Sequence, residues 1–427
     1  MLRPESFPAR GRFLFFIASL SILGFQIAHA RPSQSPPRPT FAQSQRLQKL
    51  TSDVASAAVE KFGAGGLTAD KIAISLIDLN DREHPTTSSY RGQEQIYPAS
   101  VVKLFYLAAA HHQMETGGLK QTPELERALH DMIVESSNDA THYIVDALTG
   151  TSDGPELDEP ALREWMDKRN TMNRYFASLG FEKINVNQKT WCEGPYGRER
   201  QGLGRNFEYR NKLTTEAVAR LLYEIVTGRA VSPARSRAMM ALMHRDSSTR
   251  SDDPDDQATA FSGKSLPAGS QYYSKAGWTS TTRHDAAYVR LPNGAEYISV
   301  VFTVDNSKQA DIIPFVSRLI ADDFSRTPPS ADLALVNGRL WTGNKSQPWA
   351  EALASRGERI IAVGSNDDIK KLIDSHTQVI DLQVKLATPG FIDDHNHFMS
   401  GGVQLLSIDL RDAATQEELA RRIKAYA

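Results

Sequence analysis

The sequence of 427 residues contains a single cysteine, Cys192. One cysteine excludes an intrachain disulfide framework, and it also excludes zinc or iron–sulfur sites built from several thiolates. Long runs of lysine and arginine are absent and the formal net charge is −2, which argues against nucleic-acid binding because phosphate recognition depends on clustered positive charge. With 40% hydrophobic residues, the chain has enough apolar material for two or three packed domains and is not a disordered protein.

Long hydrophobic runs are also scarce, and the one near the start predicts a signal peptide. Arginines precede an apolar stretch at residues 13–25, and the Ala-His-Ala tripeptide at 28–30 has the small-x-small pattern that signal peptidase reads. The stretch is too short to span a bilayer comfortably, which takes about 20 residues. We therefore expect export to the periplasm or the exterior, with a signal peptide at 1–30, a Pro/Ser-rich linker at 31–40 and no membrane span after cleavage. An uncleaved anchor is the alternative.

The rest of the chain divides into two parts. In residues 41–326, strand-like segments near both ends flank a series of helical segments, which predicts a layered α/β domain whose terminal segments share one sheet. Residues 327–331 are a linker that contains two prolines. Beyond it, residues 332–427 change to short β segments with turns, which indicates a second module.

The first chemical signal is a serine followed three residues later by a lysine, Ser100 and Lys103, at the start of a predicted helix. This spacing places both side chains on one helical face, one turn apart. A helix N-terminus stabilises the negative charge that develops when a serine attacks a carbonyl, and a lysine with a lowered pKa can take the serine proton. Alone, the pattern also fits an ordinary N-cap serine.

Two further segments carry polar groups that suit the same reaction. Residues 136–138 (Ser-Ser-Asn) interrupt two predicted helices and offer a hydroxyl that can relay a proton and an amide that can hold a carbonyl. Residues 275–278 (Lys-Ala-Gly-Trp) end a predicted strand, where the lysine adds positive potential and the small residues let a substrate lie along the strand edge. A helix cap and an exposed strand end are the structural alternatives.

The three motifs, in this order, resemble the active-site serine penicillin-recognising family, especially class A β-lactamases and related D,D-peptidases. The match covers roughly residues 41–324 and includes the residues that frame the motifs: Tyr97-Pro98-Ala99, Asn138-Asp139-Ala140 and Leu213-Thr214-Thr215. The resemblance implies an α/β (α+β) fold of the β-lactamase/transpeptidase type. Such a fold has an antiparallel sheet with helices plus an all-helical subdomain.

The resemblance also implies catalytic roles. Ser100 would be the acylated nucleophile, Lys103 its activating partner, and Ser136 the group that passes a proton to the leaving nitrogen. Whether the lysine or a glutamate-bound water is the base of acylation is disputed for this family.

Further residues would bind the substrate. Asn138 would hold its amide, and Lys275 would support the catalytic hydroxyl and attract the substrate carboxylate. The backbone N–H groups of Ser100 and Trp278 would form the oxyanion hole, with Gly277 between Lys275 and Trp278 in the substrate-binding strand.

Two departures of the sequence from the family pattern concern charged groups of the site. Ala276 replaces a Thr or Ser that helps to hold the substrate carboxylate, and we expect Arg283 or His284 to supply the missing charge. The segment with the deacylating glutamate is not recognisable; Glu193 is the candidate base, and a solvated loop carboxylate is the alternative. Without a positioned base the protein would behave like a penicillin-binding protein. We expect Cys192 to be a packed small residue and not a nucleophile.

The second module contains a His-x-His pair, His395 and His397. On a strand both imidazoles face the same way and can reach one divalent metal ion such as zinc. This module resembles the opening of metal-dependent amidohydrolases of the amidohydrolase 3 group, in which a small β-sandwich leads into the first strand of a (β/α)₈ barrel. Such a barrel takes about 250 residues, and catalytic zinc usually has three protein ligands. We therefore expect a truncated barrel and an incomplete metal site.

The leading hypothesis is an exported serine hydrolase of the class A β-lactamase type, which opens a β-lactam through an acyl-serine intermediate and needs no cofactor. Its partner would be a small-molecule β-lactam. The nearest alternative is a D,D-peptidase that acts on peptidoglycan peptides. A metal-dependent amidohydrolase acting through the second module, and a non-catalytic binding module, are the remaining alternatives.

Overall fold

The computed structural model describes residues 39–427 except 249–250, 327–329, 358, 375–376 and 391–396. The predicted signal peptide and most of both predicted linkers lie outside these residues. Within the described part of the chain, no helix combines the length and the hydrophobicity that a membrane span requires.

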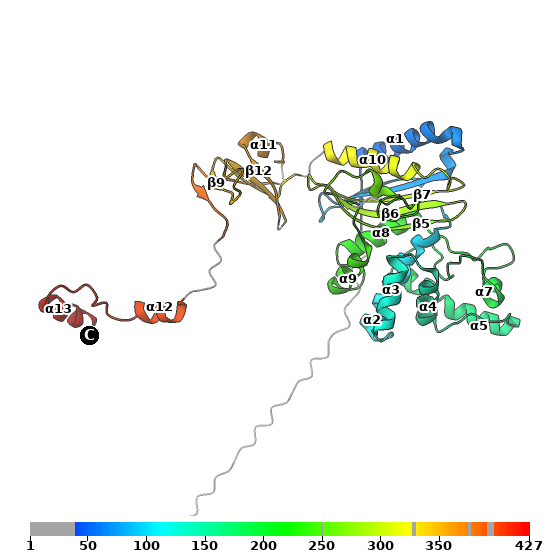
Figure 1. Ribbon diagram of the computed structural model, residues 1–427, viewed down its shortest axis with the longest axis horizontal. Coiled ribbons are helices and arrows are strands. Elements are labelled where there is room, and N and C mark those ends of the chain that lie inside the picture. The colour runs from blue at the N-terminus through cyan, green and yellow to red at the C-terminus, as the bar shows by residue number, and fades with distance from the viewer. Residues whose placement is uncertain (1–38, 249–250, 327–329, 358, 375–376, 391–396) are drawn as a thin grey trace, which may run out of the picture. The chain divides into compact units, whose positions relative to one another are not determined.

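A seven-stranded sheet is the central layer of the first domain (Figure 1). Its strands are β1 (Ala42–Gln43), β2 (Ile72–Asp78), β3 (Thr86–Tyr90), β4 (His244–Arg245), β5 (Gln271–Trp278), β6 (Arg283–Arg290) and β7 (Glu296–Thr303). Their order is β1-β3-β2-β7-β6-β5-β4, so strands from both ends of the domain are neighbours, as predicted. Every pair is antiparallel except β1 with β3, which run parallel. The expectation of an antiparallel sheet is therefore wrong at this one edge.

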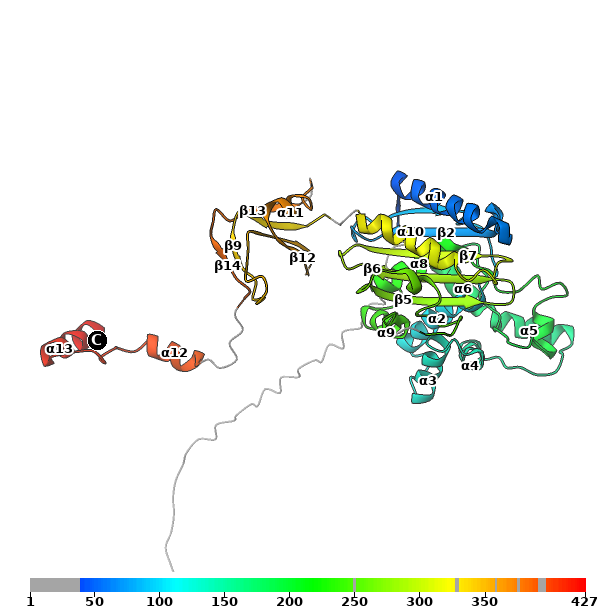
Figure 2. The ribbon, with the colours of Figure 1, turned by 45° about the horizontal axis from the view of Figure 1, so that its top comes forward.

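Helices cover both faces of this sheet (Figures 1 and 2). The first and last long helices, α1 (Gln45–Phe62) and α10 (Ile312–Arg326), pack together on one face, and α8 (Thr215–Val226) lies on the other. Each face has its own buried apolar cluster. Apolar residues recur along α1 at helical spacing, for example Val54 and Ala58, so one side of the helix is buried.

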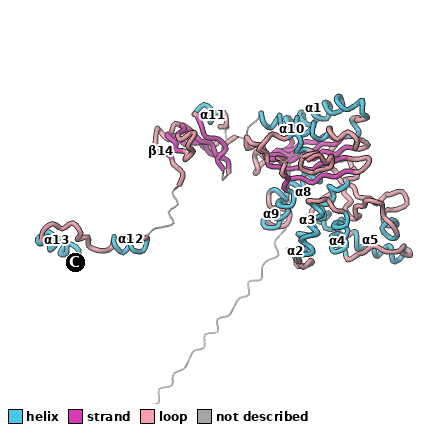
Figure 3. Tube along the Cα trace, in the orientation of Figure 1, coloured by secondary structure: helices cyan, strands magenta, loops and turns pink. Residues whose placement is uncertain are grey.

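Beyond α8 lies the predicted all-helical part, which Figure 3 shows as a region of helices without strands. It contains η3 (Ala99–Val102), α2 (Lys103–Thr116), α3 (Pro123–Ile133), α4 (Asn138–Thr149), α5 (Glu159–Arg169), α6 (Thr171–Ser178), α7 (Gly197–Gly202) and α9 (Pro233–Met243). Short 3₁₀ turns elsewhere in the domain are η1 (Gly63–Gly65), η2 (Ala69–Lys71) and η4 (Ser262–Ser265).

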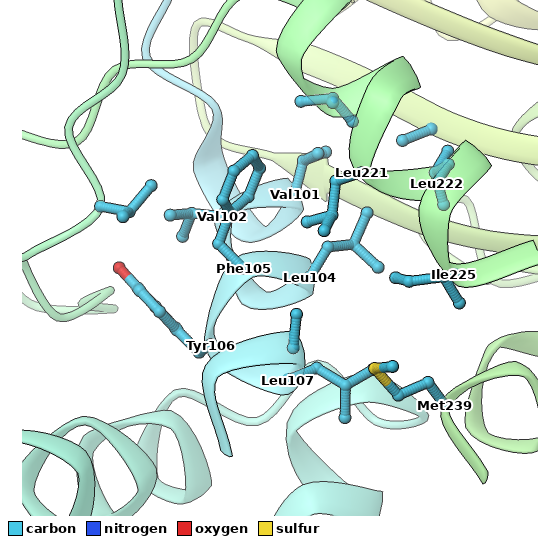
Figure 4. Close-up of a cluster of buried hydrophobic side chains, with 14 of the residues drawn as sticks. Val101, Val102, Leu104, Phe105, Tyr106, Leu107, Leu221, Leu222, Ile225 and Met239 are labelled. Carbon is cyan, nitrogen blue, oxygen red and sulfur yellow. The ribbon is translucent and has the colours of Figure 1, made fainter. Parts of the chain in front are cut away.

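The start of α2 is held in the apolar core between the sheet and these helices. Figure 4 shows Leu104 and Leu107 of α2 directed toward Leu222 of α8 and Met239 of α9. All four side chains are buried. This packing fixes the position of the helix that carries the predicted serine and lysine.

Side-chain caps define where the helices near the predicted site begin. The predicted N-cap Thr214 accepts a hydrogen bond from Ala217 N at 3.1 Å and starts α8. Ser137 caps α4 in the same way by accepting from Ala140 N at 3.2 Å. The cap ends the irregular segment between α3 and α4, so the predicted break at residues 136–138 lies where the sequence indicates.

The second module contains two small sheets. The strands β8 (Leu333–Val336), β11 (Ala352–Arg356), β12 (Arg359–Gly364) and β13 (Gln378–Asp381) form one, in the order β12-β11-β8-β13. The other has the order β10-β9-β14, from β10 (Trp349–Ala350), β9 (Arg339–Trp341) and β14 (Leu386–Ala387). Helices α11 (Asn366–Lys370), α12 (Phe398–Leu405) and α13 (Gln416–Tyr426) complete it. Of the predicted metal ligands, His395 lies outside the described residues and His397 is exposed before α12, so the metal site stays a prediction.

Replacing Leu104 by alanine is expected to destabilise the first domain by about 2–5 kcal/mol, because the side chain is fully buried in a well-packed core and its loss leaves a cavity. Urea denaturation followed by circular dichroism measures this change. Ser56→Ala, on the exposed side of α1, is the control and should change the stability by less than about 0.5 kcal/mol. Equal stabilities of the two variants would contradict the described packing.

Candidate active site

Ser100 lies in η3, a 3₁₀ turn that runs directly into α2. The backbone N–H of Lys103 donates to Ser100 O, and in a 3₁₀ turn side chains three residues apart lie one above the other. Ala99 has φ 47°, a left-handed conformation that is costly for a residue with a Cβ atom. The chain is thus bent immediately before the serine, which stands at the beginning of the helix as predicted.

The end of β5 lies directly against the backbone of this serine. A Cβ atom on Gly277 would come within 2.8 Å of Ser100 N and 2.9 Å of Pro98 O, so only a glycine fits. Trp278 follows at the end of the strand. The structure therefore brings Gly277 into contact with Ser100. The strand end that contains Gly277 and the serine are the two segments expected to supply the N–H groups of the oxyanion hole.

A buried histidine ties the segment before the serine to the sheet. His284 is opposite Gly277 in the β5–β6 register; its Nε2 donates to Tyr97 O at 2.9 Å, and its Nδ1 accepts from Thr303 N at 3.1 Å. Burial lowers the pKa of His284 to about 4, so the ring is neutral near pH 7. It supplies no positive charge for a substrate carboxylate, contrary to one of the two expectations from the sequence.

Lys103 is fully buried and makes a dense set of contacts with the α3–α4 segment. Its Nζ donates to Ser136 O at 2.6 Å and Asn138 Oδ1 at 2.9 Å, and it lies 3.3 Å from Ser136 Oγ. Burial lowers the pKa of Lys103 to about 7, and the nearby Cys192 partly opposes this shift. Near neutral pH a large fraction of the amine is therefore uncharged and can accept a proton.

Ser136 connects this amine to a second buried lysine. Lys275 Nζ donates to Ser136 Oγ at 2.9 Å, Gln257 Oε1 at 2.6 Å and Ala276 O at 2.8 Å. Burial and the neighbouring charge of Lys103 lower the pKa of Lys275 well below its ordinary value. Ser136 itself has φ 56°, a strained conformation of the kind that concentrates at functional sites. The hydroxyl thus lies between two amines, as a proton relay requires.

One predicted site residue, Arg283, lies apart from this group. Arg283 is 4% exposed; its guanidinium donates to Asp255 Oδ1 at 2.8 Å and Pro254 O at 2.6 Å and lies over the Phe261 ring. The Arg283 side chain is bound to the loop before β5, so the structure does not bring it to Ser100. Glu193 is exposed on the loop between Lys189 and α7, and its role as a base stays a prediction.

Sequence reasoning missed several residues that complete the site. Residues 246–270 look like a surface loop, yet Gln257 is only 7% exposed, and its Oε1 also accepts from Ala276 N at 3.2 Å. Thr190 Oγ1 donates to Asn138 Oδ1 at 2.7 Å. The expectation of a packed Cys192 is wrong, because this thiol is exposed and its Sγ accepts from Asn138 Nδ2 at 3.0 Å. No local pattern marks these residues, since their contacts span tens of positions.

An ion-pair network braces the two ends of the loop that contains Glu193. Arg169 and Lys189, both fully buried, pair with Glu199, which is also buried. Asp146 and Asp153 complete the network. Burial raises the pKa of Glu199 to about 7. Carboxylate oxygens of this kind can hold a metal ion, but here they already bind two cations.

Comparison with known proteins identifies the first domain. The model of the beta-lactamase enzyme family matches residues 56–324. Similar solved structures include a β-lactamase from Sphaerobacter thermophilus DSM 20745 (19% identity, 65% of this chain and 99% of that chain, TM-score 0.46) and PBP-A (18%, 67% and 99%, 0.47). The match to the family model confirms the resemblance predicted from the three motifs.

Curated relatives match much shorter stretches. Protein LONG AFTER FAR-RED 3 of Arabidopsis thaliana is 38% identical over 103 residues, 23% of this chain and 18% of the relative. An imidazolonepropionase of Fusobacterium nucleatum is 37% identical over 84 residues, 17% of this chain and 20% of the relative. The chain spans about a fifth of the length of these relatives. These matches fit the fusion with an amidohydrolase-like segment.

Replacing Gly277 by alanine should impair any reaction at Ser100, because the new methyl group would overlap the backbone nitrogen of the serine. We expect the rate of covalent labelling at Ser100 by a penicillin to fall by about tenfold or more. Gly63→Ala is the matched control, since a Cβ there meets nothing within 4 Å. Unchanged labelling of the Gly277 variant would contradict the close approach of β5.

Proposed function

Because the chain belongs to the beta-lactamase enzyme family, we propose that its first domain is an exported serine hydrolase of the class A β-lactamase type, which opens a β-lactam amide through an acyl-Ser100 intermediate. The observation that carries this proposal is the burial of Lys103 one turn after the serine, among oxygens of residues 136–138. A neutral amine at this position can take the hydroxyl proton as the oxygen attacks. Acyl transfer of this kind needs no cofactor.

Acylation proceeds by balanced proton transfers between side chains. Ser100 Oγ attacks the lactam carbonyl while its proton moves to Lys103 Nζ, and the N–H groups of Ser100 and Trp278 stabilise the oxyanion. The C–N bond then breaks, and the ring nitrogen receives a proton from Ser136, which regains one from Lys103. Lys275 keeps the relaying hydroxyl in place. The product is an ester between the serine and the opened lactam.

The rate at which this ester is hydrolysed distinguishes a β-lactamase from a D,D-peptidase. A β-lactamase hydrolyses the ester rapidly with a positioned base, for which Glu193 is the candidate. A D,D-peptidase that acts on peptidoglycan peptides is the second candidate function. One observation favours it: the loop side chains that contact Asn138 are those of Thr190 and Cys192, whereas Glu193 is exposed.

Mass spectrometry after incubation with benzylpenicillin tests the intermediate. The wild-type protein, quenched in acid within the first turnover, should gain the mass of the intact antibiotic, and Ser100→Ala should gain nothing, because the ester bond needs the hydroxyl. Nitrocefin then separates the two functions: sustained colour development is expected for the lactamase. A single burst of colour equal to the amount of enzyme would instead indicate the peptidase. Labelling of the Ser100→Ala variant would refute the acyl-serine mechanism.

The acylation rate should depend on pH through Lys103. Its pKa is lowered to about 7 by burial, so below pH 7 the protonated ammonium can accept no further proton. The second-order rate of acylation should therefore fall about tenfold per pH unit below pH 6 and level off above pH 8. Stopped-flow measurement with nitrocefin between pH 5 and 9 checks this, and a profile with no acidic limb would exclude the lysine as the base.

A further inference from the structure

Two side chains of one loop bind opposite ends of the Asn138 amide. Thr190 Oγ1 donates to Asn138 Oδ1 at 2.7 Å, and Asn138 Nδ2 donates to Cys192 Sγ at 3.0 Å. Lys103 Nζ donates to the same Oδ1 at 2.9 Å. An amide has two acceptor lone pairs and two N–H donors. Both lone pairs and one N–H are therefore used, and one N–H remains for a substrate.

The loop is itself bound along one face of α4. One turn after Asn138, His142 Nε2 donates to Thr190 O at 2.6 Å, and its ring centroid lies 4.1 Å from that of Trp191. One turn further, Asp146 pairs with Lys189 at 2.7 Å. These α4 residues are four positions apart, so they lie on the same helical face. The loop thus meets the amide from a fixed position.

We propose that Thr190 and Cys192 are positioning residues for Asn138, which together hold its amide in the one orientation that offers an N–H to the acylamino carbonyl of a substrate. This inference rests on the proposed function. Turning the amide over would point its NH₂ group at the donating amine of Lys103 and would reverse the hydrogen bonds that it makes with Thr190 and Cys192.

The two side chains suit these tasks because of their opposite hydrogen-bonding roles. The Thr190 hydroxyl is nearly inaccessible to solvent and donates to the amide oxygen. The Cys192 sulfur is a weak acceptor at the exposed side, where it leaves the second N–H of Asn138 accessible. A larger or charged side chain at position 192 would occupy the space next to that N–H.

The test compares one substrate that carries the acylamino carbonyl with one that lacks it. Benzylpenicillin and 6-aminopenicillanic acid share the reacting ring, and only the former has a carbonyl for Asn138. The variants are Thr190→Val, which keeps the shape and removes the donor, Cys192→Ala, which removes the acceptor, and Cys192→Ser, which retains an acceptor. Tyr196→Phe, an exposed change on the same loop, is the control.

With benzylpenicillin, we expect Thr190→Val and Cys192→Ala to lower the acylation efficiency by about three- to tenfold, mainly through weaker binding. Cys192→Ser, which retains an acceptor, should lose less than Cys192→Ala, and Tyr196→Phe should stay within about twofold of the wild type. With 6-aminopenicillanic acid, which lacks this carbonyl, the losses of Thr190→Val and Cys192→Ala should be at least about threefold smaller than with benzylpenicillin, and Tyr196→Phe should again match the wild type within about twofold. Melting temperatures measured in parallel show whether each variant is folded.

The possible failures can be told apart. If the wild type forms the acyl adduct and the Thr190 and Cys192 variants match it on both substrates, the positioning role is wrong and the proposed function stands. Equal losses on both substrates would also overturn the positioning role, because they indicate a general disturbance of the site. If the wild type neither forms an adduct with either penicillin, even when quenched within the first turnover, nor hydrolyses it, the proposed function and this inference fall together.

Discussion

The site depends on one costly feature, a lysine amine buried away from water. Lys103 remains in the interior because oxygens of residues 136–138 accept its hydrogen bonds, and an unpaired buried amine would strongly destabilise the fold. These oxygens are available because α3 ends before this segment and α4 begins at Asn138. Ser136 adopts a left-handed conformation in the gap. Burial of the amine, which these hydrogen bonds offset, also lowers its pKa, so the amine can act as a base near neutral pH.

The remaining contacts bring the other groups to this amine. His284 holds the segment before Ser100 against the sheet, and the absence of a side chain at Gly277 lets β5 approach the serine nitrogen. The buried cluster around Leu104 fixes the helix behind them. The sheet, the helical core and the break between α3 and α4 thus each position one part of a single site. This explains how residues more than a hundred positions apart come together in one site.

Local geometry made part of this site predictable. The three-residue spacing of Ser100 and Lys103 on a helix places their side chains together, and the N-cap Thr214 marks the start of α8 because capping is a local interaction. Contacts across the fold could not be predicted in this way. Gln257 lies in a stretch with the composition of a surface loop, yet it binds Lys275. Arg283 has the charge that a carboxylate site needs, but it is bound to Asp255.

The sequence alone therefore determined the order of the motifs, the faces on which their side chains lie and the layered α/β class, because each follows from spacings of a few residues. Tertiary structure decided the rest. The pKa of Lys103 depends on its burial. The parallel edge of the sheet depends on which strand pairs with β3. The orientation of Asn138 depends on a loop some fifty residues away in the chain. These properties arise from desolvation and from contacts between distant segments, which have no periodic signal in the chain.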